Sequence, residues 1–194
     1  MLSDLKVPLK PNKVELRQSV LRDLKSLSET EKQQKSIAIQ NSLSEKLKNK
    51  LGTWSAFQSM PTEPQISWSD VSEKIQWCFP LIENEKLSFK KSVTQFKKNA
   101  LGFKEPLDGE TVPIDQMAGF IVPGLAFDSK GHRLGRGRGF YDQTLQNIKD
   151  SAVVGICFQT AFKDVIPFED HDLKCHLVIT ENQSVVITGV HQWN

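Results

Sequence analysis

Apolar residues near the start of the chain recur with the spacing of an α-helix. They form most of one stripe, made of Val14, Val20, Leu21, Leu24 and Leu27. This stripe predicts a helix from residue 13 to about residue 27. Ser28, with Glu31 three positions later, is a capping box, so a second helix is expected to begin there and to run to about residue 48. Two charged helices therefore precede the first predicted strand.

Further along the chain, short apolar runs bounded by turn residues predict β-strands. The predicted strands lie at residues 51–59, 75–81, 87–93, 120–127, 152–158, 176–180 and 184–189. Helices are expected around residues 68–74 and over residues 141–148, and loops at residues 61–64 and 104–113. Because strands alternate with helices, we predict an α/β fold. It is expected to be a single domain over residues 1–194, with three α/β/α layers and a mostly parallel open sheet, preceded by the two N-terminal helices.

The segment before the helix at residues 141–148 is rich in glycine and arginine. It reads Gly131-His132-Arg133-Leu134-Gly135-Arg136-Gly137-Arg138-Gly139-Phe140-Tyr141-Asp142. Glycines let successive backbone N–H groups surround an anion, arginines supply paired donors, and a carboxylate beside them suggests a divalent metal. A strand, a glycine loop and a helix start, in this order, favour a phosphate site. A nucleotide is therefore the expected ligand.

Two plainer interpretations of this segment stay open. It lacks the lysine of a Walker loop, and Phe140 stands where the GxGxxG pattern needs its third glycine. A solvated basic loop would have the same composition. So would a fragment of an Arg-Gly-rich RNA-binding segment, although such segments usually repeat and this pattern occurs once.

Composition bears on the kind of partner. The 194 residues include 25 Lys and Arg against 23 Asp and Glu, and the net charge of +2 gives no global reason to expect nucleic acid. Positive charge gathers in one place, at Lys130, Arg133, Arg136 and Arg138. Such a cluster on a nearly neutral protein indicates a small anionic ligand rather than a polyanion.

Cysteine usage and hydropathy bear on the compartment. Cys78, Cys157 and Cys175 are odd in number and form no CxxC pair, which is typical of reduced thiols. No apolar stretch approaches the roughly 20 residues that a membrane span needs, and the polar N-terminus has no signal-peptide core. We therefore expect a cytoplasmic protein without a membrane partner. A monomer without a nucleic-acid partner is expected as well, although the sequence does not fix the oligomeric state.

Four segments of the chain resemble one known family. Residues 124–142 resemble the signature segment of the 5-formyltetrahydrofolate cyclo-ligases, also called methenyltetrahydrofolate synthetases. Residues 13–17 match the family's N-terminal KxxLR pattern, and residues 102–106 resemble its G-[FI]-x-E-P motif. His171-Asp172 with Thr180-Glu181 resembles its C-terminal HDxxxDxxxTE stretch. The resemblance thus covers nearly the whole chain, from about residue 13 to about residue 181.

The resemblance implies an ATP- and Mg²⁺-dependent enzyme that closes 5-formyltetrahydrofolate to 5,10-methenyltetrahydrofolate, with release of ADP and phosphate. Transfer of the γ-phosphoryl group to the formyl oxygen makes an iminium phosphate. The neighbouring secondary amine then attacks the activated carbon and expels phosphate. Such chemistry depends mainly on positioning and on charge stabilisation of the phosphoryl group.

The resemblance also implies roles for particular residues. The nucleotide-binding set is Lys13, Arg17, Arg133, Leu134, Gly135, Arg136, Gly137, Arg138, Gly139, Phe140 and Tyr141. Within this set Arg136 and Tyr141 are implied to be catalytic, with Arg136 at the transferring phosphoryl group. The substrate-binding set is Phe57, Met60 and Glu63, and the metal-binding set is Asp142 and His176.

Most of these residues also have an ordinary structural interpretation. Lys13 and Arg17 would lie on a solvated helix face, and Arg133 and Arg138 would face water. Tyr141 would pack on the sheet, Asp142 would cap a helix, and Glu63 would be an exposed loop residue.

Two departures from the family pattern bear on activity. Phe140 replaces the first tyrosine of the family's usual Tyr-Tyr-Asp, and His176 replaces a second metal-linked aspartate. Because Mg²⁺ prefers hard oxygen ligands, either water replaces that carboxylate, or metal binding is weaker, or turnover is lost. A zinc site made of His171, Asp172, Cys175 and His176 is disfavoured, since adjacent residues of a strand point to opposite faces.

Three hypotheses therefore remain. An active cyclo-ligase is favoured. A folate- or nucleotide-binding relative without turnover is the second hypothesis, and an RNA-binding protein that uses the arginine loop is the third.

Overall fold

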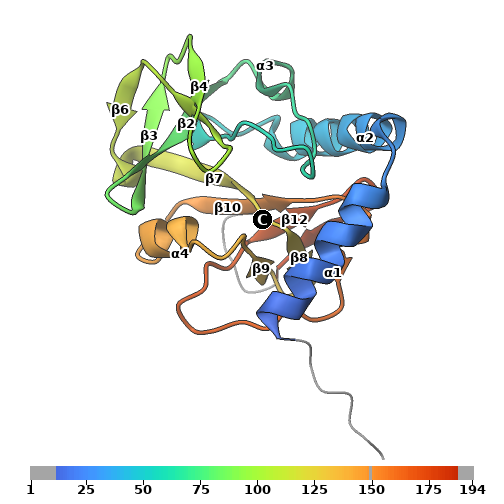
Figure 1. Ribbon diagram of the computed structural model, residues 1–194. Helices are drawn as coiled ribbons and strands as arrows, with labels where there is room; N and C mark the ends of the chain where they lie inside the picture. Colours follow the sequence, from blue (N-terminus) through green and yellow to red (C-terminus); the bar gives the residue numbers. More distant parts are fainter. Residues whose placement is uncertain (1–11, 149, 188–194) are drawn as a thin grey trace, which may run out of the picture.

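A computed structural model describes residues 12–148 and 150–187. The strands of its main sheet are β1 (Gly52–Ser55), β2 (Ile75–Glu83), β3 (Lys86–Lys91), β6 (Glu110–Val112), β7 (Met117–Pro123), β10 (Ala152–Ile156), β12 (Leu177–Ile179) and β13 (Ser184–Val186). They lie in the order β13-β12-β10-β7-β1-β2-β3-β6 (Figure 1). The strands from β12 to β2 in this order are parallel, whereas β13, β3 and β6 pair antiparallel at the two edges. The predicted mostly parallel open sheet is confirmed.

Helices cover both sides of this sheet. The α-helices of the described residues are α1 (Lys13–Ser26), α2 (Glu29–Leu47), α3 (Trp68–Val71) and α4 (Phe140–Leu145). Both long helices start with a capping box, in which the side chains of Asn12 and Ser28 accept from the backbone N–H groups of Glu15 and Glu31. In Figure 1, α2 and α3 lie above the central strands, and α1 and α4 lie beside and below them. The predicted α/β class with two N-terminal helices is therefore confirmed.

The prediction of one strand over residues 120–127 is wrong. β7 ends at Pro123, and after a turn the chain forms β8 (Ala126–Asp128). This strand belongs to a separate sheet of order β11-β8-β9, with β9 at Arg133–Leu134 and β11 at Phe162–Lys163. Gly124 permits the turn, because a Cβ at that position would lie 2.6 Å from the ring of Phe127. Because of this break, residues 131–142, the Gly/Arg segment, follow the small sheet and not the main one.

Residues 104–113 are not the loop that the sequence predicts. β5 (Lys104–Pro106) pairs with β4 (Phe96–Lys98), and β6 extends the main sheet beyond β3. The β4–β5 hairpin packs against β2, with 5.1 Å between the ring centroids of Phe96 and Phe79. Short edge strands of this kind contain no sustained apolar alternation, which is why the sequence pattern misses them.

Several other elements are shorter than predicted. The strand expected at residues 51–59 ends at Ser55, and the helix expected at residues 68–74 ends at Val71. The helix expected at residues 141–148 begins one residue earlier and ends at Leu145. Of the strand expected at residues 184–189, β13 ends at Val186, while residues 188 and 189 lie outside the described residues. No described helix combines the length and the apolar character needed to cross a bilayer.

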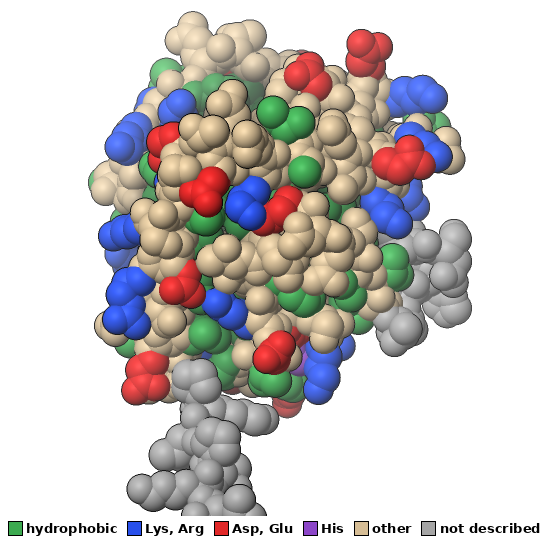
Figure 2. All heavy atoms as spheres, turned by 90° about the vertical axis from the view of Figure 1, so that its right-hand side faces the viewer, with side chains coloured by type: hydrophobic (Ala, Val, Ile, Leu, Met, Phe, Trp, Pro, Cys, Tyr) green, Lys and Arg blue, Asp and Glu red, His purple; other side chains and the backbone are tan. Residues whose placement is uncertain are grey.

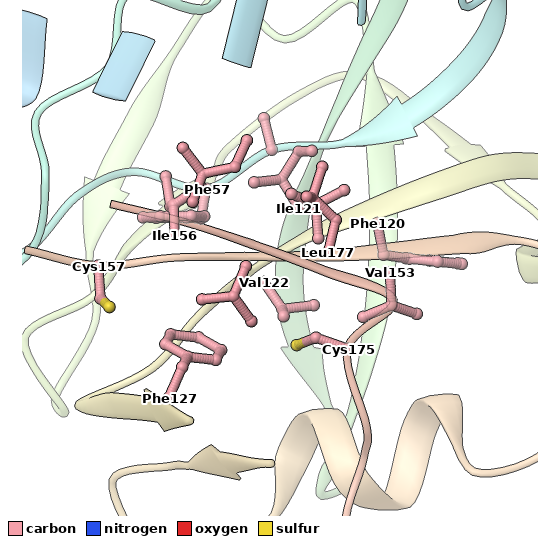
Figure 3. Packing of buried hydrophobic residues seen from close by; sticks show 14 of the residues in the cluster. Phe57, Phe120, Ile121, Val122, Phe127, Val153, Ile156, Cys157, Cys175 and Leu177 are labelled. Atoms are coloured by element: carbon pink, nitrogen blue, oxygen red, sulfur yellow. The ribbon is translucent and has the colours of Figure 1, made fainter. Parts of the chain in front are cut away.

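The small sheet packs directly on the main one. Phe127 of β8 is fully buried, and it lies with Val122 on the opposite side of the central strands from Phe57 and Ile121 (Figure 3). Gly155 of β10 makes this contact possible, since a Cβ there would lie 2.4 Å from the Phe127 ring. The close packing places β9, and the rest of the Gly/Arg segment after it, beside the ends of the parallel strands.

The cysteines are buried free thiols, and Cys157 and Cys175 are seen within the apolar cluster of Figure 3. Burial raises the pKa of Cys78 and of Cys175 to about 12, and raises that of Cys157 as well. Because the thiolate is the reactive form, we expect the native protein to be alkylated about a thousandfold more slowly than the unfolded protein at pH 8. Mass-spectrometric counting of alkylated cysteines over time checks this, and equal rates with and without denaturant would contradict it.

Candidate active site

The Gly/Arg segment is anchored by a β-hairpin. β8 and β9 pair antiparallel, with Ala126 opposite Leu134 and Phe127 opposite Arg133. A further backbone bond of 2.8 Å runs from the N–H of Leu125 to the carbonyl of Leu134. The hairpin thus fixes the position of Arg133 before the chain turns away.

Two glycines carry the segment from the hairpin into α4. Gly137 has a φ of 96° and Gly139 a φ of 68°, both in the left-handed region that glycine adopts readily. Gly139 is the N-cap of α4, and Asp142 lies inside the first turn of that helix. The interpretation of Asp142 as a helix cap is therefore wrong.

Arg133 is buried, with 7% of its surface exposed, and it does not face water. Its Nη2 donates to Oδ1 of Asp142 at 2.8 Å, and its Nη1 donates to the carbonyl of Pro123 at 3.1 Å. The guanidinium carbon lies 5.4 Å from the centre of the Tyr141 ring. Its Nε and the Tyr141 hydroxyl are buried without a hydrogen-bond partner in the described part of the chain. Tyr141 also packs against the hydrophobic core, as its ordinary structural interpretation predicts.

A polar cavity lies between α1, the Gly/Arg segment and α4. Its lining includes Lys13, Arg17, Arg133, Leu134, Gly135, Gly137, Gly139, Asp142, His171 and Asp172. Arg17 donates from Nε to the carbonyl of Gly135 at 2.8 Å. Lys13 donates from Nζ to Asp172 at 2.6 Å and to Glu169 at 2.9 Å. The two basic side chains of α1 are held at the cavity, so the interpretation of a solvated helix face is wrong for them.

An aromatic cavity lies on the other side of the Gly/Arg segment. Its walls include Phe57, Glu63, Ile82, Leu87, Phe103, Glu105, Arg136, Arg138, Phe140 and Tyr141. Glu63 is 5% exposed, which contradicts its interpretation as an exposed loop residue. Its Oε1 accepts from Nη2 of Arg136 at 2.8 Å and from Nε at 3.2 Å. Its Oε2 accepts from the N–H of Met60 at 2.9 Å.

The remaining predicted residues divide between these surroundings. Met60 contacts Glu63 through its backbone and does not line either cavity. Arg138 is exposed at the edge of the aromatic cavity and forms no ion pair with any described residue. Phe140 lines the aromatic cavity. The tyrosine hydroxyl that the family usually has at this position is therefore absent from the wall of that cavity.

The two cavities share a wall. Arg133, Gly135 and Gly139 line both of them. A ligand in the polar cavity and a ligand in the aromatic cavity would therefore meet across this short stretch of the Gly/Arg segment.

His176 is placed away from the polar cavity, in a neighbouring depression that also borders Asp172. Its Nδ1 accepts a hydrogen bond of 3.1 Å from the N–H of Val153, and its own N–H donates to the carbonyl of Val153. The imidazole thus helps to join the chain to β10. Among the described residues no group of three or more His, Cys, Asp or Glu side chains is placed to hold a metal, and the zinc alternative therefore has no support.

The electrostatics of the two cavities favour a charged carboxylate at Asp142 and a neutral phenol at Tyr141. Burial alone would raise the pKa of Asp142, but Arg133, the N–H of Leu173 and Lys13 together hold that pKa below its usual range. Burial raises the pKa of Tyr141, so its hydroxyl stays protonated. Burial would lower the pKa of Lys13, but its bonds to Asp172 and Glu169 raise it overall.

The lowered pKa of Asp142 has a consequence for acid stability. A carboxyl group with a folded-state pKa below its unfolded value stabilises the fold above about pH 4, and this contribution is lost as the pH falls towards the folded value. We expect the free energy of unfolding to fall less between pH 5 and pH 3 in Asp142→Asn than in the unchanged protein. Denaturant titrations across that range measure it, and parallel pH profiles for the two proteins would contradict the expectation.

Two residues that line the cavities were not assigned to the site from the sequence. Asp172 borders the polar cavity although His176, four residues later, is the residue given the metal role. Glu105, in a segment predicted to be a loop, is a buried wall residue of the aromatic cavity. The motifs around residues 102–106 and 171–172 are the available signals for both, but motifs alone do not show which side chains face a cavity.

The fold and this site define an α/β protein with a cationic glycine loop between a polar and an aromatic cavity, a design suited to holding a phosphate-bearing ligand beside a flat organic one. A model of the 5-formyltetrahydrofolate cyclo-ligase family matches residues 9–181. The chain therefore belongs to the 5-formyltetrahydrofolate cyclo-ligase family.

Similar proteins agree with this assignment. The chain is 39% identical to the 5-formyltetrahydrofolate cyclo-ligase of Haemophilus influenzae over 84 residues, 41% of this chain and 45% of the relative. It is 39% identical to that of Mycolicibacterium smegmatis over 90 residues, 44% of this chain and 45% of the relative. The chain thus spans about half the length of these curated relatives.

Solved structures extend the likeness over most of the chain. The 5,10-methenyltetrahydrofolate synthetase of Aquifex aeolicus has a TM-score of 0.76 and 26% identity, over 92% of this chain and 94% of that chain. The synthetase of Mycoplasma pneumoniae has a TM-score of 0.74 over 88% of this chain and 99% of that one, and at 21% identity it supports the fold alone.

Proposed function

We propose that this protein uses Mg-ATP to convert 5-formyltetrahydrofolate into 5,10-methenyltetrahydrofolate, with release of ADP and phosphate. The observation that carries the proposal is the shared wall, where Arg133, Gly135 and Gly139 border both a polar and an aromatic cavity. Phosphoryl transfer to the formyl oxygen requires the two substrates to meet with their reacting atoms about 3–3.5 Å apart. Two adjoining cavities of different chemistry support the proposal, because they would hold the two substrates side by side.

The polar cavity is the proposed place of the ATP phosphates. Lys13 and Arg17 border it from α1, and the backbone from Gly135 to Gly139 curves around it. Lys13 is paired with Asp172 and Glu169, so it would exchange part of this pairing for a phosphate oxygen. Arg17 keeps Nη donors beyond its Nε bond to Gly135.

The aromatic cavity is the proposed place of the folate, with Phe57 as one of its flat walls. Arg136 reaches this cavity from the glycine loop and is the proposed donor to the transferring phosphoryl group. Its fork-shaped guanidinium matches the charge that develops on the phosphoryl oxygens. The buried, unpaired hydroxyl of Tyr141 and Nε of Arg133 supply two further donors at the wall.

Carboxylates at the polar cavity suit a magnesium ion, because Mg²⁺ takes hard oxygen ligands and is usually held by one or two carboxylates together with substrate phosphates. Within the described residues, the hydrogen bonds of Asp142 use Oδ1 and those of Asp172 use Oδ2, which leaves one oxygen of each. We propose these two residues as the holders of the ion, with Asp172 in place of His176. Bound there, the ion would neutralise phosphate charge.

The alternatives have weaker support. The case for a relative without turnover depends on His176 and Phe140. His176 lies outside the polar cavity, and Phe140 lines the aromatic cavity. The case for RNA binding needs an extended basic surface, but on the side that carries α1 and α2 acidic and basic side chains are interspersed (Figure 2). The cytoplasmic location and the monomeric state stay predictions.

The test is direct. The purified protein is mixed with 5-formyltetrahydrofolate and Mg-ATP, the near-ultraviolet absorbance of the methenyl product is followed, and ADP is measured in parallel. We expect equal amounts of both products, and neither product when ATP is omitted or the metal is chelated. Binding of folate and nucleotide without either product would overturn the proposal in favour of a binding protein.

A further inference from the structure

The turn that joins β8 to β9 contains a buried acid with two separate sets of partners. Asp128 is 1% exposed and is not among the described residues that line the two cavities. Its Oδ1 accepts from the backbone N–H groups of Lys130 and His132, at 2.9 and 3.0 Å, which are the bonds that a tight turn needs. Its Oδ2 accepts from the N–H of Ile166 at 3.1 Å, 38 positions later in the chain. The second oxygen thus joins the turn to a distant segment.

His132, at the end of the same turn, contacts that segment as well. Its Nδ1 lies 2.9 Å from Oδ2 of Asp128. Its ring is stacked on the ring of Phe168, with 3.9 Å between the centroids and 8° between the planes. Because Phe168 is 54% exposed, this stack is its main attachment to the fold. A backbone bridge between His132 and Lys174 adds a contact further along the segment.

The segment held in this way borders the polar cavity. Residues 164–176, all of them described, form no helix or strand between β11 and β12, so other contacts have to fix their path. Asp172 lines the cavity, and the N–H of Leu173 donates to Asp142 at 3.1 Å. The turn holds the chain on both sides of these residues, at positions 166–168 before them and at Lys174 after them.

The position of Asp172 needs such support. Asp142 and Asp172 border the same cavity, and two carboxylates placed side by side repel each other. An irregular segment could relieve this repulsion by moving Asp172 outwards. Attachment to the turn opposes that movement. A ligand that uses both carboxylates then binds more tightly, because less ordering remains to be done when it arrives.

We propose that Asp128, His132 and Phe168 are positioning residues for nucleotide binding, which hold residues 166–174 so that Asp172 already faces the polar cavity before the nucleotide arrives. This inference rests on the proposed function, since it takes Mg-ATP as the occupant of that cavity. The three residues act through Asp172 and do not touch the nucleotide themselves.

The experiment measures binding of Mg-ATP by calorimetry in the absence of folate, for the unchanged protein and for two variants of Phe168. Phe168→Leu keeps an apolar side chain but loses the flat surface that stacks on His132, whereas Phe168→Tyr keeps the ring. We expect the dissociation constant for Mg-ATP to rise about 3- to 10-fold in Phe168→Leu and to stay within about twofold in Phe168→Tyr. The affinity for 5-formyltetrahydrofolate, measured without ATP, is expected to be unchanged in both.

Asp128→Asn tests the hydrogen bond to Ile166. Asparagine can keep the bonds of the turn through its oxygen, but it places an NH₂ group opposite the N–H of Ile166. We expect Mg-ATP to bind about 10- to 100-fold more weakly. Val165→Ala is the matched control, because Val165 lies in the same segment and is 48% exposed, and it should bind Mg-ATP as the unchanged protein does. Thermal midpoints show whether each variant is folded, and if Asp128→Asn is not, the two Phe168 variants decide alone.

A double-mutant comparison shows whether the effect passes through Asp172. In an Asp172→Asn background, Phe168→Leu is expected to cause no further loss of Mg-ATP affinity. The inference is overturned by a change of less than twofold in Phe168→Leu, by an equal loss in Phe168→Tyr, by a matching loss of folate affinity, or by full additivity with Asp172→Asn. If the unchanged protein binds Mg-ATP but forms no methenyl product, the proposed function fails while the nucleotide comparison still decides the inference. A protein that binds no nucleotide would overturn both.

Discussion

Replacing Arg136 with alanine is expected to lower kcat/KM for methenyl formation by about a thousandfold. Arg136 is one of the cations of the Gly/Arg segment that line the aromatic cavity, and it is the proposed donor to the phosphoryl group in transfer. The charge on the phosphoryl oxygens is greatest in the transition state, so loss of this donor affects the chemical step more than binding. Initial rates over a range of folate concentrations at saturating ATP measure kcat/KM, and their plateau gives the change in kcat.

Arg136→Ala also leaves Glu63 buried without its cation, so the fold of the variant has to be checked by its thermal midpoint and circular dichroism. Arg22→Ala is the matched control, because Arg22 is exposed on α1 and lies outside both cavities. Arg136→Lys keeps the charge and loses the planar fork, and an intermediate activity is expected for it. A folded Arg136→Ala variant that stays within tenfold of full activity would disprove the catalytic role.

Gly131→Ala is expected to destabilise the protein by about 3 kcal/mol, which for a chain of this size is a fall of roughly 6–12 °C in Tm. Gly131 has a φ of 82°, and a Cβ there would lie 2.3 Å from the backbone carbonyl oxygen of Cys175. Neither atom can move alone, because the N–H of Cys175 donates to the carbonyl of Gly131 at 2.8 Å. Strain and steric overlap therefore add at one residue.

Gly102→Ala separates these two contributions. Gly102 also has a positive φ, of 88°, but a Cβ there would meet only the end of the Lys98 side chain, at 3.8 Å. We expect a loss of about 1 kcal/mol from backbone strain alone. Denaturant unfolding of both variants tests the comparison, and equal losses would show that the contact with Cys175 is unimportant.

The sequence pattern predicts those helices and strands that are determined by neighbouring residues. The start of α2 follows from Ser28 and Glu31, and the parallel strands from their apolar runs. The same logic fails at residues 120–127, where an apolar run that contains Pro123-Gly124 spans two strands because both sheets bury it. The Pro123-Gly124 pair is the only sign of the break in the sequence, and such a pair also occurs inside irregular strands.

The site divides in the same way. Glycine and arginine in one short segment predict a phosphate loop, since its chemistry is contained in consecutive residues. The pairing of Arg136 with Glu63 joins positions 73 apart in sequence, and that of Lys13 with Asp172 joins positions 159 apart. No local pattern predicts such contacts, because they depend on the order of the strands in the sheet. Which acids face a cavity, and which are already paired, therefore required the structure.

The link between Lys13 and Asp172 means that the polar cavity is closed by the two far ends of the matched region. During synthesis, α1 leaves the ribosome before any strand of the main sheet, but its partner near residue 172 appears only after every parallel strand except β12 has been made. Contacts of such long range form late, since the loop between them must be closed first. A nascent chain therefore has no complete polar cavity until synthesis has passed residue 172, and a ligand of that cavity cannot stabilise folding intermediates formed before then.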